Sequence, residues 1–93
     1  PPTPEQIRLT AKAANAAGDV ADAYSYMAEY HLMSGDLLLA INQMELALSV
    51  PSLTQQQRSK FVARLQEMRE WLPKERNRSR QPDNGTQSPP AGG

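Results

Sequence analysis

With 93 residues, the chain has room for one small domain, and its lack of cysteine excludes a disulfide framework and a thiolate metal site. Ten Asp and Glu balance ten Lys and Arg, which argues against a nucleic-acid-binding domain, because such domains usually carry a net basic charge. No apolar run approaches the length that a bilayer-spanning helix requires. The sequence opens Pro-Pro-Thr-Pro without Met or a signal peptide, so we expect a segment of a longer protein.

The first two expected helices cover residues 4–17 and 19–34. Thr3 is a suitable N-cap for the first, Pro4 fits the first helical position, and Gln6 completes a capping box. Apolar residues then recur at helical spacing on one face of each segment. In the first helix they are Ile7, Ala11 and Ala14, and in the second Val20, Ala23, Tyr24, Met27, Ala28 and His31.

The third and fourth expected helices cover residues 36–50 and 55–72. Pro51 ends the third, because the residue before a proline is biased away from helix. Thr54 and Gln57 form a second capping box, and Leu72-Pro73 ends the fourth helix. The expected buried faces are Leu37, Ala40, Ile41, Met44, Ala47 and Leu48 in the third helix, and Phe61, Leu65, Met68 and Leu72 in the fourth.

Two Gly-Asp pairs, Gly18-Asp19 and Gly35-Asp36, lie 17 residues apart between alanine-rich stretches. Gly ends a helix at little cost because it adopts a left-handed conformation, and Asp can then accept hydrogen bonds from the first N–H groups of the next helix. Short antiparallel helices are therefore expected. The spacing is half of the roughly 34-residue tetratricopeptide period. We predict an all-α fold of about four helices in antiparallel, tetratricopeptide-like hairpins over residues 1–73.

The remaining residues, 74–93, are rich in Arg, Asn, Ser, Pro and Gly and contain no aromatic or large aliphatic side chain. Such a composition cannot offset the entropy of ordering, so we expect a disordered tail. Its basic run suggests a contact with anionic lipid headgroups as a weaker hypothesis than a solvated tail.

The net charge of zero conceals two opposed regions. Residues 13–57 hold five acids and no Lys or Arg, whereas residues 58–80 hold eight basic residues against three Glu. We expect the fourth helix to lie against acidic neighbours, which is a simpler explanation than a nucleic-acid site.

The segment 22–52 resembles a tetratricopeptide repeat, with small residues where paired helices approach most closely. The matching positions are Tyr24, Met27, Ala28, His31, Gly35, Asp36, Ala40, Met44, Ala47 and Pro51. His31 stands where the repeat has Tyr, Met44 where it has an aromatic residue, and the proline comes one residue early.

A narrower resemblance rests on three runs: Ala28-Glu29-Tyr30-His31-Leu32-Met33-Ser34-Gly35-Asp36, residues 40–48 (Ala-Ile-Asn-Gln-Met-Glu-Leu-Ala-Leu) and residues 57–65 (Gln-Arg-Ser-Lys-Phe-Val-Ala-Arg-Leu). They resemble the C-terminal repeat domain of BepA-like periplasmic zinc metallopeptidases of Gram-negative bacteria. The resemblance implies a periplasmic parent protein with an upstream protease domain that holds zinc. It also implies a role in assembling or degrading outer-membrane proteins, with the barrel-assembly machinery and the protease domain as partners.

The segment itself offers no catalytic or metal site. The family's His-Glu-x-x-His motif is absent, and the single histidine, His31, is followed by Leu32. There is also no nucleophile motif and no Gly-rich phosphate loop. We therefore expect a non-catalytic protein–protein interaction domain without a cofactor of its own. The alternative is a stand-alone tetratricopeptide adapter or scaffold of the cell envelope.

Candidate partner-binding residues lie on two faces of the second helix and at the end of the fourth. The repeat alignment places Asp22 and Glu29 on the concave side, where their charge disfavours acidic peptide tails and favours a basic or apolar ligand. A stripe of Tyr and Met suits either a peptide-binding face or a contact with another domain, and the single Trp suits either a partner anchor or the end of a small core. The candidates are Asp22, Tyr26, Glu29, Tyr30, Met33 and Trp71.

Overall fold

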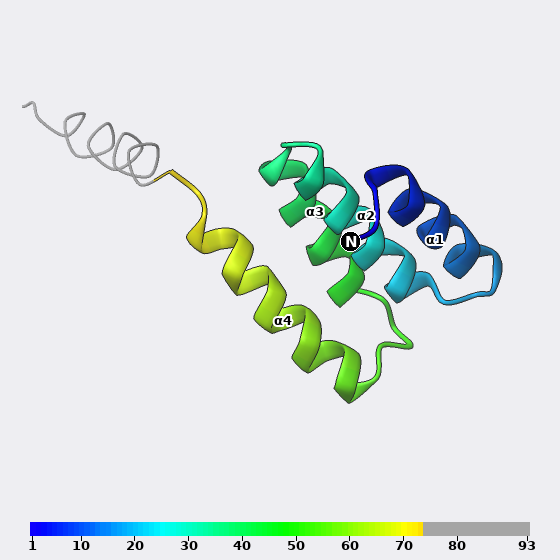
Figure 1. Ribbon diagram of the computed structural model, residues 1–93. Helices are drawn as coiled ribbons and strands as arrows, with labels where there is room; N and C mark the ends of the chain where they lie inside the picture. Colours follow the sequence, from blue (N-terminus) through cyan, green and yellow to red (C-terminus); the bar gives the residue numbers. More distant parts are fainter. Residues whose placement is uncertain (74–93) are drawn as a thin grey trace, which may run out of the picture.

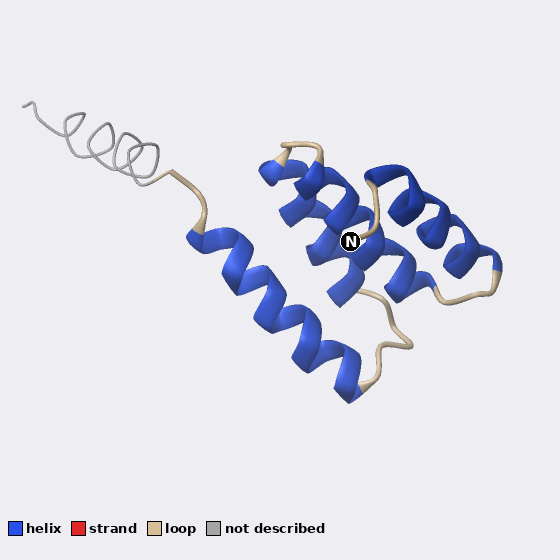
Figure 2. Ribbon diagram, in the orientation of Figure 1, coloured by secondary structure: helices blue, strands red, loops and turns tan. Residues whose placement is uncertain are grey.

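The computed structural model describes residues 1–73, and the predicted disordered tail, residues 74–93, lies outside the described residues. Residues 1–73 form four α-helices and no strand (Figure 2). The helices are α1 (Pro4–Ala16), α2 (Val20–Met33), α3 (Leu37–Leu48) and α4 (Gln55–Glu70). The predicted all-α fold of antiparallel hairpins is confirmed.

Capping interactions place the starts of α1 and α4 where the sequence predicts them. Thr3 Oγ1 accepts the Gln6 N–H at 3.2 Å, while Gln6 Oε1 accepts the Thr3 N–H at 2.9 Å. Thr54 and Gln57 exchange the same two hydrogen bonds at 3.0 and 2.9 Å. Each box satisfies two backbone donors that would otherwise lack a partner inside the helix.

Both Gly-Asp pairs form the expected helix ends. Gly18 and Gly35 each have φ of +86°, and no other residue type in the described chain has a positive φ. The Gly18 N–H donates to Asn15 O at 3.1 Å and the Asp19 N–H to Ala14 O at 2.8 Å. The second junction repeats this pattern from Gly35 and Asp36. These paired bonds are Schellman motifs, which satisfy the last carbonyls of a helix and reverse the chain.

The two Asp residues differ in what they do for the next helix. The Asp36 carboxylate accepts the Leu39 N–H at 3.1 Å, as predicted. The corresponding prediction for Asp19 is wrong, because its side chain makes no capping hydrogen bond. Val20, the first residue of α2, is 40% exposed, so water reaches the first turn and can satisfy its N–H groups.

Helix α3 ends two residues earlier than predicted, at Leu48 rather than Val50. The Ser49 hydroxyl donates to Leu46 O at 2.7 Å, and the Val50 N–H reaches back to Ala47 O. These bonds tighten the end of the helix before Pro51, whose ring disfavours helical conformation at the preceding residue.

The helices pack in chain order, with α1 against α2, α2 against α3 and α3 against α4. Figure 1 shows α1 and α4 on opposite sides of the α2–α3 pair. Corresponding N-caps recur at nearly constant intervals: Thr3 and Asp36 are 33 residues apart, and Asp19 and Thr54 are 35 residues apart. The fold is therefore a stack of helical hairpins in which α1 corresponds to α3 and α2 to α4.

The core joins α2, α3 and α4 through small and large side chains. Ala28, Ala40 and Ala47 have no exposed surface, which allows close approach of the helix backbones. The remaining buried members of the cluster are Ala21, Ile41, Met44, Phe61, Leu65 and Met68. The predicted faces of α3 and α4 are confirmed. In α2, the prediction of Val20 as a core residue is wrong, because Val20 is 40% exposed and the neighbouring Ala21 is buried instead.

Candidate groove between α2 and α4

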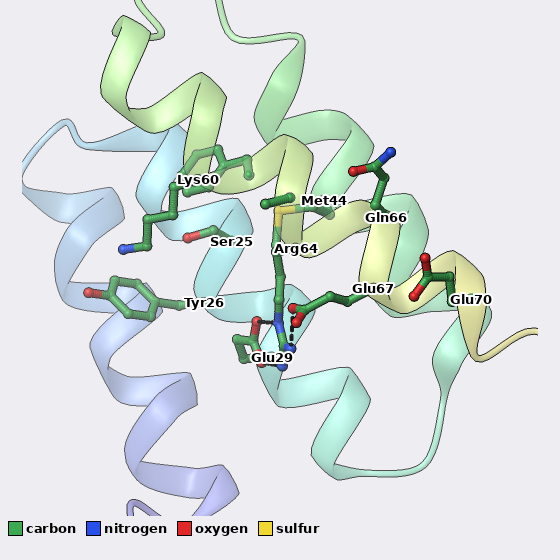
Figure 3. Close-up of a pocket in the computed structure, with 11 residues that line it drawn as sticks. Ser25, Tyr26, Glu29, Met44, Lys60, Arg64, Gln66, Glu67 and Glu70 are labelled. Atoms are coloured by element: carbon green, nitrogen blue, oxygen red, sulfur yellow. Dashed lines mark hydrogen bonds and ion pairs between the residues drawn. The ribbon is translucent and has the colours of Figure 1, made fainter.

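A groove of about 570 Å³ runs between α2 and α4 (Figure 3). The helix α3 supplies part of its floor through Met44, which is fully buried, and α4 supplies Phe61 beside it. The rim is polar and charged. The lining residues are Ser25, Tyr26 and Glu29 from α2, Met44 from α3, and Lys60, Phe61, Ala63, Arg64, Gln66, Glu67 and Glu70 from α4. An apolar floor inside a charged rim is the usual form of a site for a peptide segment.

One bidentate ion pair ties the two walls of the groove together. Arg64 Nε and a terminal nitrogen of its guanidinium each donate to Glu29, both at 2.7 Å, and the other terminal nitrogen donates to Glu67 Oε1 at 3.0 Å. The hydrogen bonds to Glu29 are the main cause of a raised pKa at Arg64. Arg64 and Glu29 are about one-third exposed, which makes this pair more protected from water than a fully exposed surface pair.

Further contacts join α4 to acidic residues of α2 and α3. Gln57 Nε2 donates to Asp22 Oδ1 at 3.1 Å, and an Arg69 terminal nitrogen donates to Glu45 Oε2 at 2.6 Å. Together with the Arg64–Glu29 pair, these contacts confirm that α4 lies against acidic neighbours within the same chain. The charge separation in the sequence thus helps to dock α4.

The Trp71 ring lies at the end of α4, where the Arg64 guanidinium carbon is 5.5 Å from the ring centroid. This is the geometry of a cation–π contact. The side chain of Trp71 is 51% exposed. Trp71 therefore helps to fix the position of Arg64 while one side of its ring stays open to solvent.

The structure does not bring the six predicted partner-binding residues together. Tyr26 and Glu29 line the groove, and Asp22 lies beside it through its bond to Gln57. Tyr30 lies outside the groove. Tyr30 also meets the His31 ring edge-on, with centroids 5.2 Å apart. Met33 is exposed at the end of α2, outside the groove.

The sequence-based list omits the wall that α4 contributes to the groove. Lys60, Arg64 and Glu67 are spaced by four and three residues and so occupy one face of a helix. That spacing was a usable signal. It did not reveal the site because the position of α4 opposite α2 depends on packing through α3, which no local pattern encodes.

Within residues 1–73, no group of three His, Cys, Asp or Glu side chains is arranged to hold a metal ion. In the same part of the chain, no helix combines the length and apolar character needed to cross a membrane. Comparisons of the chain with protein-family models, curated proteins and solved structures found no match.

Proposed function

We propose that this chain is a non-catalytic protein–protein interaction domain that binds a partner segment in the groove between α2 and α4. The observation that carries the proposal is the form of the groove. The exposed side chains of Tyr26 and Ala63 offer apolar surface above the buried Met44 and Phe61, and the rim offers charged groups already held in place by the Arg64–Glu29 pair. A preorganised rim lowers the entropy that a ligand must overcome on binding.

The tetratricopeptide assignment is supported by the geometry of the stack. The N-cap intervals of 33 and 35 residues bracket the roughly 34-residue period of that repeat. The fully buried Ala28, Ala40 and Ala47 occupy the positions at which the repeat has small residues. In such a stack α2 and α4 are equivalent helices of successive units, and α4 acts as a terminal helix with a polar outer face.

The charges of the groove favour a basic or apolar ligand. Three Glu and two cations line it, and one of those cations, Arg64, is already paired with two of the carboxylates. The Glu70 carboxylate also lies on the rim, and it makes no ion pair with any other described residue. A ligand cation that approaches Glu70 gains a partner, whereas a ligand carboxylate finds only Lys60 without an ion pair, beside three Glu.

The proposed parent is a BepA-like periplasmic metallopeptidase acting in outer-membrane protein assembly and degradation. This part of the proposal rests on the sequence resemblance over the three runs in residues 28–36, 40–48 and 57–65. In that setting the groove positions a substrate or an assembly partner for a zinc-containing protease domain elsewhere in the protein. The alternative is a stand-alone adapter of the cell envelope, which uses the same groove without an attached protease.

Peptide mapping of the native polypeptide separates these two functions. The polypeptide is recovered with an antibody against the described segment, and its tryptic peptides are sequenced. We expect peptides from outside the 93-residue segment to include a helix with a His-Glu-x-x-His motif, because the family's catalytic zinc requires two His one turn apart. A complete map without that motif would refute the metallopeptidase parent and leave the adapter.

A further inference from the structure

A second groove, of about 500 Å³, lies on the opposite side of α2, between α1 and α3. Its α2 residues include Ala23 and Met27, whereas the first groove uses Ser25 and Glu29. At about 100° per residue these two sets point in opposite directions from the helix axis. Helix α2 therefore separates two distinct grooves.

The charge of the second groove is opposite to that of the first. Arg8 and Lys12 are the only Lys or Arg in residues 1–57, and both line this groove. They are four residues apart and so project from the same face of α1. None of the residues that line it is Asp or Glu, among those the structure describes. Residues 1–57 carry six Asp and Glu, and both of their cations line this one groove.

The two cations differ in their availability. Arg8 is held by Glu5, with one terminal nitrogen 2.6 Å from Glu5 Oε2, and Glu5 is the largest cause of its raised pKa. The Lys12 ammonium group makes no ion pair with any other residue in 1–73. Lys12 is thus ready to meet a carboxylate from outside, with Arg8 oriented beside it.

The floor of the second groove, between the two cations and α3, is apolar. Ala11 and Ala23 are buried, and their small side chains leave room that larger residues would fill. Met27 is half-buried at the floor, and Val20 is 40% exposed at the edge. An apolar ligand side chain has surface to cover here, while the amide side chains of Asn15 and Gln43 offer hydrogen bonds to a peptide backbone.

We propose that the α1–α3 groove binds an acidic peptide segment, with carboxylates at Lys12 and Arg8 and an apolar side chain against Met27 and Val20. Charge complementarity selects this partner, because the two cations stand alone in an acidic region. A nucleic acid fits less well, since its affinity grows with the number of phosphates that Lys and Arg neutralise, and only two cations are present. The domain would then hold two segments of opposite charge on opposite faces, which goes beyond the function proposed above.

Fluorescence anisotropy tests this with the 93-residue chain and a labelled peptide of alternating Glu and Phe. We expect saturable binding that weakens as salt is added. Lys12→Glu places a like charge against the ligand and should raise Kd by about tenfold or more. Arg58→Glu is the matched control, since it makes the same change in charge at an exposed helical residue that lines neither groove, and Kd should stay unchanged. Val20→Glu adds a carboxylate at the edge of the second groove and should also raise Kd.

Circular dichroism establishes that each variant keeps the helical content of the parent chain. If Lys12→Glu loses structure, Val20→Glu still tests the proposal. This variant should stay folded, because an acidic residue in the first turn of a helix is favourable. The proposal fails if the unaltered chain does not bind the peptide, or if Lys12→Glu and Arg58→Glu weaken binding equally. Complete competition by phosphate alone, or tighter binding of a single-stranded oligonucleotide through Lys12, would also overturn it.

Discussion

Truncation of Phe61 to Ala should remove most of the stability of the domain. Phe61 is 2% exposed and is the largest side chain that joins α4 to the core. A buried Phe→Ala change costs about 3–5 kcal/mol, through lost burial and the cavity that remains. A domain of about 70 residues rarely has more than about 3–5 kcal/mol of stability in total. We therefore expect loss of the cooperative urea transition that circular dichroism records for the unaltered chain.

Val62→Ala is the control for this change. Val62 is the next residue of α4 but is 43% exposed. Its truncation should alter the free energy of unfolding by no more than about 0.5 kcal/mol, as is usual for surface positions. Equal urea midpoints for Phe61→Ala and Val62→Ala would mean that α4 is not docked through Phe61.

Enlargement of the alanines between the helices should also destabilise the domain. Ala28 and Ala47 have no exposed surface, so Ala28→Leu or Ala47→Phe must push α2 and α3 apart or force strained rotamers. Overpacking of this kind costs about 1–3 kcal/mol. In a domain of this size each kcal/mol lowers the thermal midpoint by about 4–8 °C.

Ala13→Leu serves as the comparison for the overpacked variants. Ala13 lies in the middle of α1 and is exposed, and Leu is nearly as good a helix former as Ala. Its thermal midpoint should match that of the unaltered chain. Unchanged midpoints for both Ala28→Leu and Ala47→Phe would show that the register of the α2–α3 hairpin is wrong.

Local patterns in the sequence were sufficient to predict the helices and most of the core residues. Gly18 and Gly35 mark chain reversals because only the left-handed conformation at those positions completes the Schellman bonds. The capping boxes at Thr3 and Thr54 form as predicted because all their partners lie within three residues. Asp19 shows the limit of such rules, since an N-cap residue need not use its side chain where water reaches the first turn.

The grooves could not be predicted to the same degree, because they depend on which helices face one another. The pairing of Glu29 with Arg64 links positions 35 residues apart, and only packing of both helices on α3 brings them together. The sequence identified Glu29 and Tyr26 from one wall but not Lys60 or Ala63 from the other. Tyr30 and Met33 share a stripe with Tyr26 in sequence, yet neither of them lines the groove.

Site-specific photo-crosslinking tests the central claim, that the α2–α4 groove binds a protein segment. A photoreactive phenylalanine analogue replaces either Ala63, which is exposed and lines the groove, or Val62, which is exposed on the same helix outside it. Both variants are irradiated in the native protein in its own cells, and adducts are identified by mass spectrometry. We expect a defined adduct with a protein segment from position 63 and none from position 62. Equal yields from the two positions, or an adduct from position 62 alone, would contradict the account.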